Sequence, residues 1–154
     1  MMDTVKILES LDIGYEVVVA SAHRTPRRTE EWASSAADRG LRVLIAAAGG
    51  AAALPGVVAA FSSLPVIGVP LAATTLNGLD ALLSIVQMPK GVPVATVAIG
   101  AWGAANAAIL AAQILSVADA ELGKRLAAYR KRLSDEVDER ARRVADKLKS
   151  RSGG

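Results

Sequence analysis

Residues 15–26 read Tyr-Glu-Val-Val-Val-Ala-Ser-Ala-His-Arg-Thr-Pro, and our prediction of the fold starts from them. Its first half is an unbroken apolar run with three β-branched valines, which is typical of a short strand buried on both faces of a parallel sheet. Its second half predicts a helix that begins near Thr25, because threonine caps helices and the proline that follows suits the first turn. We therefore predict a strand over residues 15–20 that leads directly into a helix.

Three side chains with useful chemistry lie between this strand and this helix. Ser21, His23 and Arg24 would stand at the carboxyl end of the strand, where open α/β sheets bind their ligands. An imidazole can carry a proton near neutral pH, and an arginine beside a helix N-terminus attracts phosphate or carboxylate. A lone histidine is more often structural than catalytic, but the serine and the arginine beside it favour a functional role.

Strand-like and helix-like segments alternate along the chain. Helices are expected over residues 1–11, 25–39, 55–62, 79–88, 104–115 and 119–149, and strands over residues 15–20, 41–47, 65–70 and 92–99. This order predicts an α/β fold with a parallel sheet and right-handed crossovers. The glycine pair at 49–50 would let backbone N–H groups approach a ligand, and tight packing between strand and helix explains the pair equally well.

The composition restricts the classes of function. The 154 residues suffice for one domain, and its core must be aliphatic because 52% of the residues are hydrophobic and only 3% are aromatic. The absence of cysteine and the single histidine exclude disulfides, a thiolate nucleophile and a Cys- or multi-His-bound metal, and they fit a cytoplasmic protein. Neither a signal peptide nor a membrane span is expected, because prolines interrupt every long apolar window.

Charge is distributed unevenly. Between residues 41 and 118 only Arg42, Asp80 and Lys90 are charged, so we expect other subunits to cover this part of the surface in an oligomer. From residue 119 onward, 11 basic and seven acidic residues surround one apolar stripe. A nucleic-acid-binding helix is one interpretation, but the interleaved acids and the lack of aromatics favour an arm that packs on a neighbouring subunit. We therefore expect a core domain over 1–118, a helical arm of the same domain over 119–150 and a flexible tail over 151–154.

Several motifs, in order along the chain, resemble the class I PurE family, the N5-carboxyaminoimidazole ribonucleotide mutases of purine biosynthesis. They are Ser-Ala-His-Arg-Thr-Pro at 21–26, Ala-Gly-Gly-Ala-Ala at 48–52, Leu-Pro-Gly at 54–56, Leu-Pro-Val-Ile-Gly-Val-Pro at 64–70, Leu-Asn-Gly-Leu-Asp at 76–80, Leu-Ser-Ile-Val-Gln-Met-Pro at 83–89, Gly-Val-Pro-Val-Ala-Thr-Val-Ala-Ile-Gly at 91–100 and Gly-Ala-Ala-Asn-Ala-Ala at 103–108. The resemblance covers nearly the whole chain. It implies a flavodoxin-like three-layer sandwich and a homo-octamer in which the last helix packs on a neighbouring subunit.

The resemblance also implies a reaction. Enzymes of this family move a carboxylate from the exocyclic nitrogen of an aminoimidazole ribonucleotide to a ring carbon, without metal or cofactor. His23 would be the general acid and base, carbon dioxide would be held briefly beside Ser21 and the 49–50 turn, and Arg24 would bind the ribose phosphate. The remaining substrate contacts implied are Ala22, Ala48, Gly49, Gly50 and Leu54.

The sequence departs from the family pattern at several positions. The family begins with a strand that ends in a Met-Gly-Ser-x-Ser-Asp loop, which contacts the ribose phosphate, and here Met1 and Met2 stand where that loop should end. Ala53 takes the place of a second active-site histidine, Ala47 that of a glycine and Ala72 that of a polar residue. These departures leave a second interpretation open: a truncated or engineered oligomeric scaffold derived from the family, with little or no catalytic activity.

Overall fold

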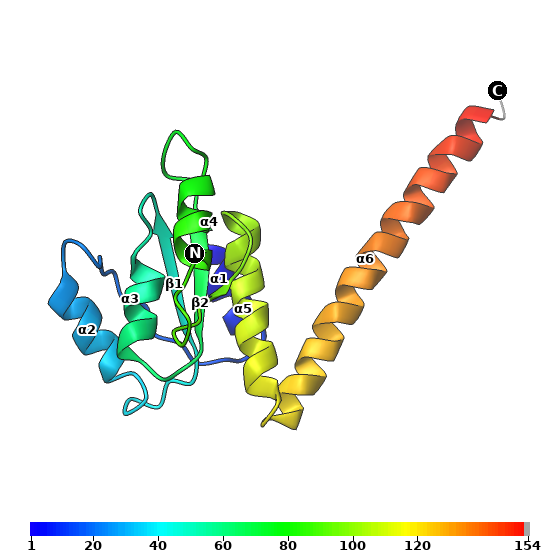
Figure 1. The fold of residues 1–154 in the computed structure, drawn as a ribbon. Helices are drawn as coiled ribbons and strands as arrows, with labels where there is room; N and C mark the ends of the chain where they lie inside the picture. The colour runs from blue at the N-terminus through cyan, green and yellow to red at the C-terminus, as the bar shows by residue number, and fades with distance from the viewer. Residues whose placement is uncertain (153–154) are drawn as a thin grey trace. The chain divides into compact units, whose positions relative to one another are not determined.

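The computed structural model describes residues 1–152, and the chain divides into two compact units. The first unit, from Met1 to Leu115, contains a parallel sheet and the helices that cover it. The second unit begins at Ser116 and consists almost entirely of one long helix (Figure 1). The two units therefore divide between Leu115 and Ser116.

The order of helices and strands largely follows the predicted alternation. The helices are α1 (Met2–Ser10), α2 (Pro26–Ser34), α3 (Leu54–Phe61), α4 (Leu79–Val86), α5 (Ala101–Ser116) and α6 (Ala120–Ser152), and the strands are β1 (Leu44–Gly49), β2 (Val66–Leu71) and β3 (Ala95–Thr96). The strands form one sheet in the order β1-β2-β3, and both pairs are parallel. The predicted α/β class with a parallel sheet is confirmed.

Helices cover both faces of the sheet. On one face, Leu44 and Val66 pack against Ala33 of α2 and Val58 of α3. On the other face, Ile67 packs against the buried alanines of α5, whose small side chains let the helix approach the sheet closely. Figure 1 shows the two helical layers with the sheet between them, and this arrangement confirms the three-layer sandwich.

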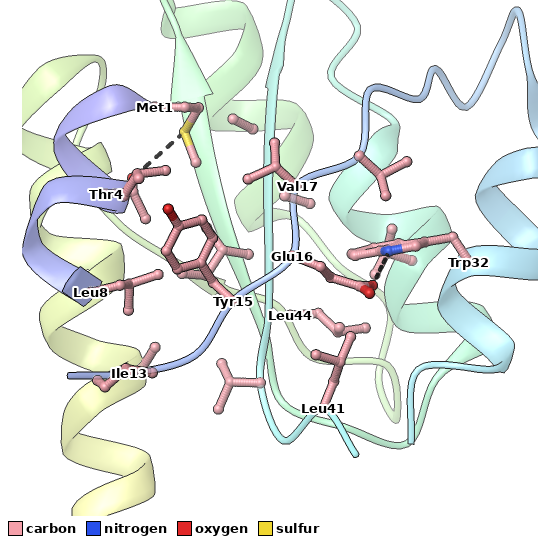
Figure 2. A pocket seen from close by; sticks show the side chains of 18 of the residues that line it. Met1, Thr4, Leu8, Ile13, Tyr15, Glu16, Val17, Trp32, Leu41 and Leu44 are labelled. Atoms are coloured by element: carbon pink, nitrogen blue, oxygen red, sulfur yellow. Dashed lines mark hydrogen bonds between the residues drawn. The ribbon is translucent and has the colours of Figure 1, made fainter. Parts of the chain in front are cut away.

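The predicted strand over residues 15–20 is wrong. In the part of the chain that the structure describes, this segment pairs with no strand, and Val17 and Val19 are 69% and 85% exposed. A β-branched run forms a strand only where a neighbouring edge accepts its hydrogen bonds, and here a groove separates the segment from β1. Figure 2 shows the segment stretched along this groove.

Three other predicted elements have different bounds. The helix expected to reach residue 39 ends at Ser34, because the hydroxyls of Ser34 and Ser35 donate to carbonyls one turn earlier and compete with the helical bonds. Gly40 ends the turns that follow, with φ +86°. The strand expected over residues 41–47 is β1, which begins at Leu44 and ends at Gly49. The strand expected over 92–99 shrinks to Ala95–Thr96, since Pro93 has no N–H to donate to a ladder.

Helix α6 agrees with the long amphipathic helix predicted after residue 119. Asp119 caps its first turn by accepting the N–H of Leu122 at 3.0 Å. Ion pairs one turn apart stabilise its polar faces, among them Lys131 with Asp135 at 2.8 Å. Its apolar stripe is exposed at Val137. Of the predicted tail, residues 151–152 belong to α6 and residues 153–154 lie outside the described part of the chain.

Among the described helices, none combines the length and hydropathy that a membrane span requires.

Candidate active site

The loops that follow the strands meet at the carboxyl edge of the sheet. β1 ends at Gly49, and a Cβ atom on this residue would lie 2.6 Å from Cβ of Ala73 in the loop after β2. Gly50 has φ +63°, which favours glycine, and the N–H of Ala52 donates to the Gly49 carbonyl at 3.2 Å. The glycine pair thus serves two needs: Gly49 lets two loops touch, and Gly50 turns the chain.

The turn over residues 21–25 is closed by its own hydrogen bonds. The N–H of Ser21 donates to the Thr25 hydroxyl at 2.8 Å, the N–H of Thr25 donates to the Ser21 carbonyl at 2.8 Å, and the N–H of Arg24 donates to the Ser21 hydroxyl at 3.2 Å. Thr25 precedes α2 as predicted, but its hydroxyl holds this turn and does not cap the helix. The turn is therefore a defined local structure that presents the side chains between Ser21 and Thr25.

His23 and Arg24 project from this turn toward solvent. Both are exposed, and within residues 1–152 neither side chain makes a hydrogen bond or ion pair to another residue. The first turn of α2 contains no acidic residue, so the positive end of the helix dipole beside Arg24 is not neutralised locally. An imidazole, which could transfer a proton, and a guanidinium, which could bind an anion, thus stand side by side.

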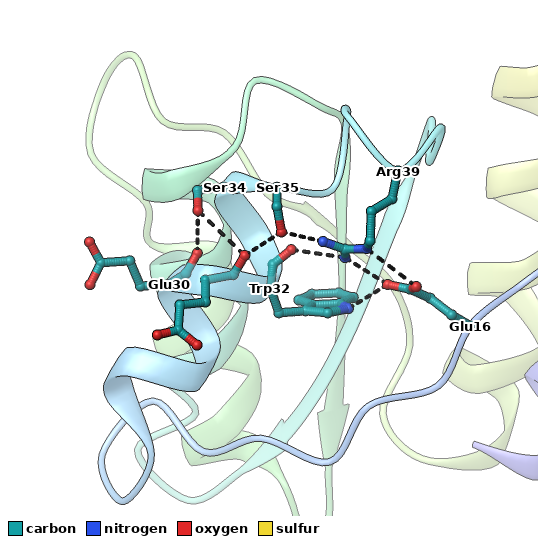
Figure 3. A network of polar contacts seen from close by, with 7 residues as sticks. Glu16, Glu30, Trp32, Ser34, Ser35 and Arg39 are labelled. Atoms are coloured by element: carbon teal, nitrogen blue, oxygen red, sulfur yellow. Dashed lines mark hydrogen bonds and ion pairs between the residues drawn. The ribbon is translucent and has the colours of Figure 1, made fainter.

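The segment before this turn is fixed to α2 by a polar network (Figure 3). The carboxylate of Glu16 accepts from Arg39 Nη2 at 2.7 Å and from the indole N–H of Trp32 at 2.6 Å. The hydrogen bond from the Arg39 guanidinium lowers the pKa of Glu16, and burial opposes this shift. Arg39 also donates to the Trp32 carbonyl at 3.0 Å. The network holds the segment in place without strand pairing.

Sequence reasoning missed a polar pair that joins the loop after β2 to the first turn of α4. The Thr74 hydroxyl donates to the Asp80 carboxylate at 2.7 Å, and this hydrogen bond is the main cause of the lowered pKa of Asp80. Asn77 and Gly78, with φ +50° and +86°, turn the chain back so that the two residues meet. The available signal was the Leu-Asn-Gly-Leu-Asp motif, in which Asp80 is the only charged residue between Arg42 and Lys90.

The structure places the predicted site residues in two groups. Ala48, Gly49 and Gly50 lie at the end of β1 against the loop after β2, whereas residues 21–24 form the separate turn before α2. No hydrogen bond joins the two groups in the described chain. Leu54 is apart from both, since it begins α3 and lines the apolar groove beside β1. Residues 1–152 also contain no cluster of His, Cys, Asp and Glu that could hold a metal ion.

Known proteins with similar sequences and folds point to one family. Residues 1–136 match the family described as AIR carboxylase. The chain is 54% identical over 144 residues to the N5-carboxyaminoimidazole ribonucleotide mutase of Thermotoga maritima, covering 94% of this chain and 83% of that protein. It is 53% identical over 137 residues to the Escherichia coli protein of the same name, covering 89% and 81%. The crystal structure of Treponema denticola PurE is similar with a TM-score of 0.78 and 27% identity, covering 90% of this chain and 85% of that one.

Proposed function

Because this chain belongs to the AIR carboxylase family, we propose that it is a mutase of purine biosynthesis. It would move a carboxylate from the exocyclic nitrogen of an aminoimidazole ribonucleotide to a ring carbon. The observation that carries this proposal is the high identity to relatives named as this mutase over more than four-fifths of their length. The same observation favours the mutase over a scaffold without catalytic activity.

His23 is the proposed general acid and base. Its protonated imidazole would donate to the exocyclic nitrogen as the N–C bond breaks, which releases carbon dioxide and leaves the aminoimidazole neutral. The ring carbon would then attack carbon dioxide, and the imidazole would take the ring proton and return to its protonated form. The exposed position of His23 and its lack of internal partners in the described chain support this role, since the ring can turn toward a ligand.

Arg24 is the proposed ligand of the ribose phosphate. A guanidinium binds phosphate through charge-assisted hydrogen bonds, and the N-terminus of α2 adds backbone N–H groups and a positive dipole end. Ser21 and Ala22 would contact the substrate from the same turn. Ala48, Gly49 and Gly50 would shield carbon dioxide between the two half-reactions, and Leu54 would provide an apolar contact. No metal or cofactor enters this scheme.

The test is interconversion of the two carboxylated aminoimidazole ribonucleotides, followed by ultraviolet absorption with the purified chain. The proposal predicts conversion that saturates with substrate and is unchanged by a metal chelator. A folded chain, checked by circular dichroism, that does not exceed the uncatalysed rate would contradict the mutase and support the scaffold.

We further propose a cytoplasmic homo-octamer with no nucleic acid or membrane partner, in which the apolar stripe of α6 packs on a neighbouring subunit. The exposed Val137 lies on this stripe. Val137→Lys should reduce the mass measured by light scattering, because it places a charge in the contact. The control Ser134→Lys changes a neighbouring exposed position off the stripe. Equal masses for both variants and the parent chain would contradict this use of α6.

A further inference from the structure

The loop after β2, residues 72–78, lies against the glycine pair at the end of β1. A Cβ atom on Gly49 would lie 2.6 Å from Cβ of Ala73, and a Cβ atom on Gly50 would lie 3.6 Å from the methyl carbon Cγ2 of Thr74. The Thr74 methyl group is therefore in contact range of the turn that Gly50 makes. Any movement of this methyl group changes the space directly beside the turn.

Two hydrogen bonds fix the hydroxyl group of Thr74. The hydroxyl donates to Oδ2 of Asp80 at 2.7 Å and accepts the N–H of Leu76 at 3.2 Å. The hydroxyl and the methyl group are attached to the same Cβ atom, so holding one of them also fixes the direction of the other. Asp80 thus determines where the Thr74 methyl group lies.

Asp80 is well suited to hold another residue in place. It lies in the first turn of α4, where the positive end of the helix dipole stabilises a carboxylate. The hydrogen bond from Thr74 is the main cause of its lowered pKa, so the carboxylate is ionised at neutral pH. An ionised acceptor holds a hydroxyl about twice as strongly as a neutral acceptor does.

The residue that follows Asp80 holds the other end of the glycine turn. Ala81 is fully buried in one cluster with Ala52, whose N–H donates to the Gly49 carbonyl at 3.2 Å. Ala52 has φ +42°, a left-handed conformation that is unfavourable for alanine and persists only where the surrounding structure imposes it. Two consecutive residues of α4 therefore hold the turn, Ala81 by packing and Asp80 through Thr74.

We propose that Asp80 is a positioning residue for carboxylate transfer, and that through Thr74 it holds the glycine turn against carbon dioxide between the two half-reactions. This proposal rests on the mutase function proposed above. The first half-reaction breaks the N–C bond, leaves its electron pair on the protonated nitrogen and frees carbon dioxide. The second forms the C–C bond when the ring carbon attacks. A turn that moves would let carbon dioxide diffuse away before the C–C bond forms.

The first test measures carbon dioxide release from substrate labelled in its carboxylate, after subtraction of the release without enzyme. Asp80→Ala should raise the fraction of turnovers that lose the label by about ten-fold, because a hydrogen bond to a charged group contributes at least about this factor. Asp80→Asn retains an acceptor for Thr74 and should stay within about three-fold of the parent chain. A slower reaction with an unchanged fraction in Asp80→Ala would overturn the proposal, because a destabilised fold loses both half-reactions together.

A variant of Thr74 tests whether Asp80 acts through this residue. Thr74→Val removes both hydrogen bonds but retains the shape of the side chain, so it should raise the released fraction as Asp80→Ala does. The two changes combined should stay within about two-fold of either one, since both break the same contact. Multiplied effects would overturn the proposal. If Asp80→Ala fails to fold, Thr74→Val decides the question.

Amide hydrogen exchange distinguishes failure of this proposal from failure of the proposed function, because it needs no substrate. In Asp80→Ala and Thr74→Val, peptides that contain the Ala52 N–H should exchange about ten-fold faster than in the parent chain, while Asp80→Asn should change little. Unchanged exchange would overturn the proposal even if the parent chain is an active mutase. Faster exchange in a parent chain that converts no substrate would instead overturn the proposed function, and with it the role of Asp80 in carboxylate transfer.

Discussion

The segment at 15–20 and strand β2 have nearly the same local sequence signal but opposite environments. Both are short apolar segments that contain β-branched residues, three valines in the first and two valines and an isoleucine in β2, and both were predicted to be buried strands. In β2, Val66 and Val69 are 4% and 0% exposed, whereas Val17 and Val19 in the segment are 69% and 85% exposed. β2 has a paired strand on each side, and the segment has none in the described chain. Burial of a strand thus depends on its neighbours in the sheet more than on its own residues.

The largest loss of stability is expected for a substitution in the buried strand β2. Ile67→Ala should lower the free energy of unfolding by about 2–5 kcal/mol, because Ile67 is fully buried between the sheet and α5 and the smaller side chain leaves a cavity. Val19→Ala in the exposed segment should change it by less than about 0.5 kcal/mol. Urea denaturation measures both values. Similar losses for the two variants would show that the segment is packed as β2 is.

Glycines in the two regions provide a second contrast. Gly49→Ala should cost about 1–3 kcal/mol, because the new Cβ would lie 2.6 Å from Cβ of Ala73 and force the loop after β2 to move. Gly14→Ala, before the segment, meets no atom within 4 Å and should be neutral or stabilising by about 0.4–1 kcal/mol. Thermal unfolding of the two variants measures this difference. A neutral Gly49→Ala would mean that the two loops are not held together.

The network that holds the segment predicts a small, pH-dependent effect. The pKa of Glu16 is lowered in the folded chain, mainly by Arg39, so its contribution to stability is present above its ordinary pKa of 4.5 and is lost as pH falls through the lower folded value. Glu16→Gln should lower the free energy of unfolding by about 0.2–1 kcal/mol near pH 7 and by less in acid. Glu30→Gln, which alters an exposed carboxylate on α2, is the control. An equal loss at both pH values would contradict an ionic role.

The alternation of helices and strands could be predicted from sequence, because periodicity and the turn residues are local signals. The β2 strand and the α3 helix were placed within one residue at each end. The environment of residues 15–20 could not be predicted, since a β-branched run does not show whether a partner strand is present. The pairing of Thr74 with Asp80 was also missed, because it depends on the left-handed turn at Asn77 and Gly78. His23 and Arg24 were found from their neighbours along the chain, and their roles remain predictions.

We propose that proton transfer in the reaction depends on one exposed side chain, His23 in the turn at 21–25, and this is the central claim. The most direct test measures the rate of carboxylate transfer and the free energy of unfolding on one variant, His23→Asn. Because His23 is exposed and has no internal partner in the described chain, unfolding should change by less than about 0.5 kcal/mol. The rate should fall on the order of a hundred- to ten-thousand-fold, as expected when a general acid and base is removed. An unchanged rate, or a fall in rate matched by a loss of stability, would contradict the claim.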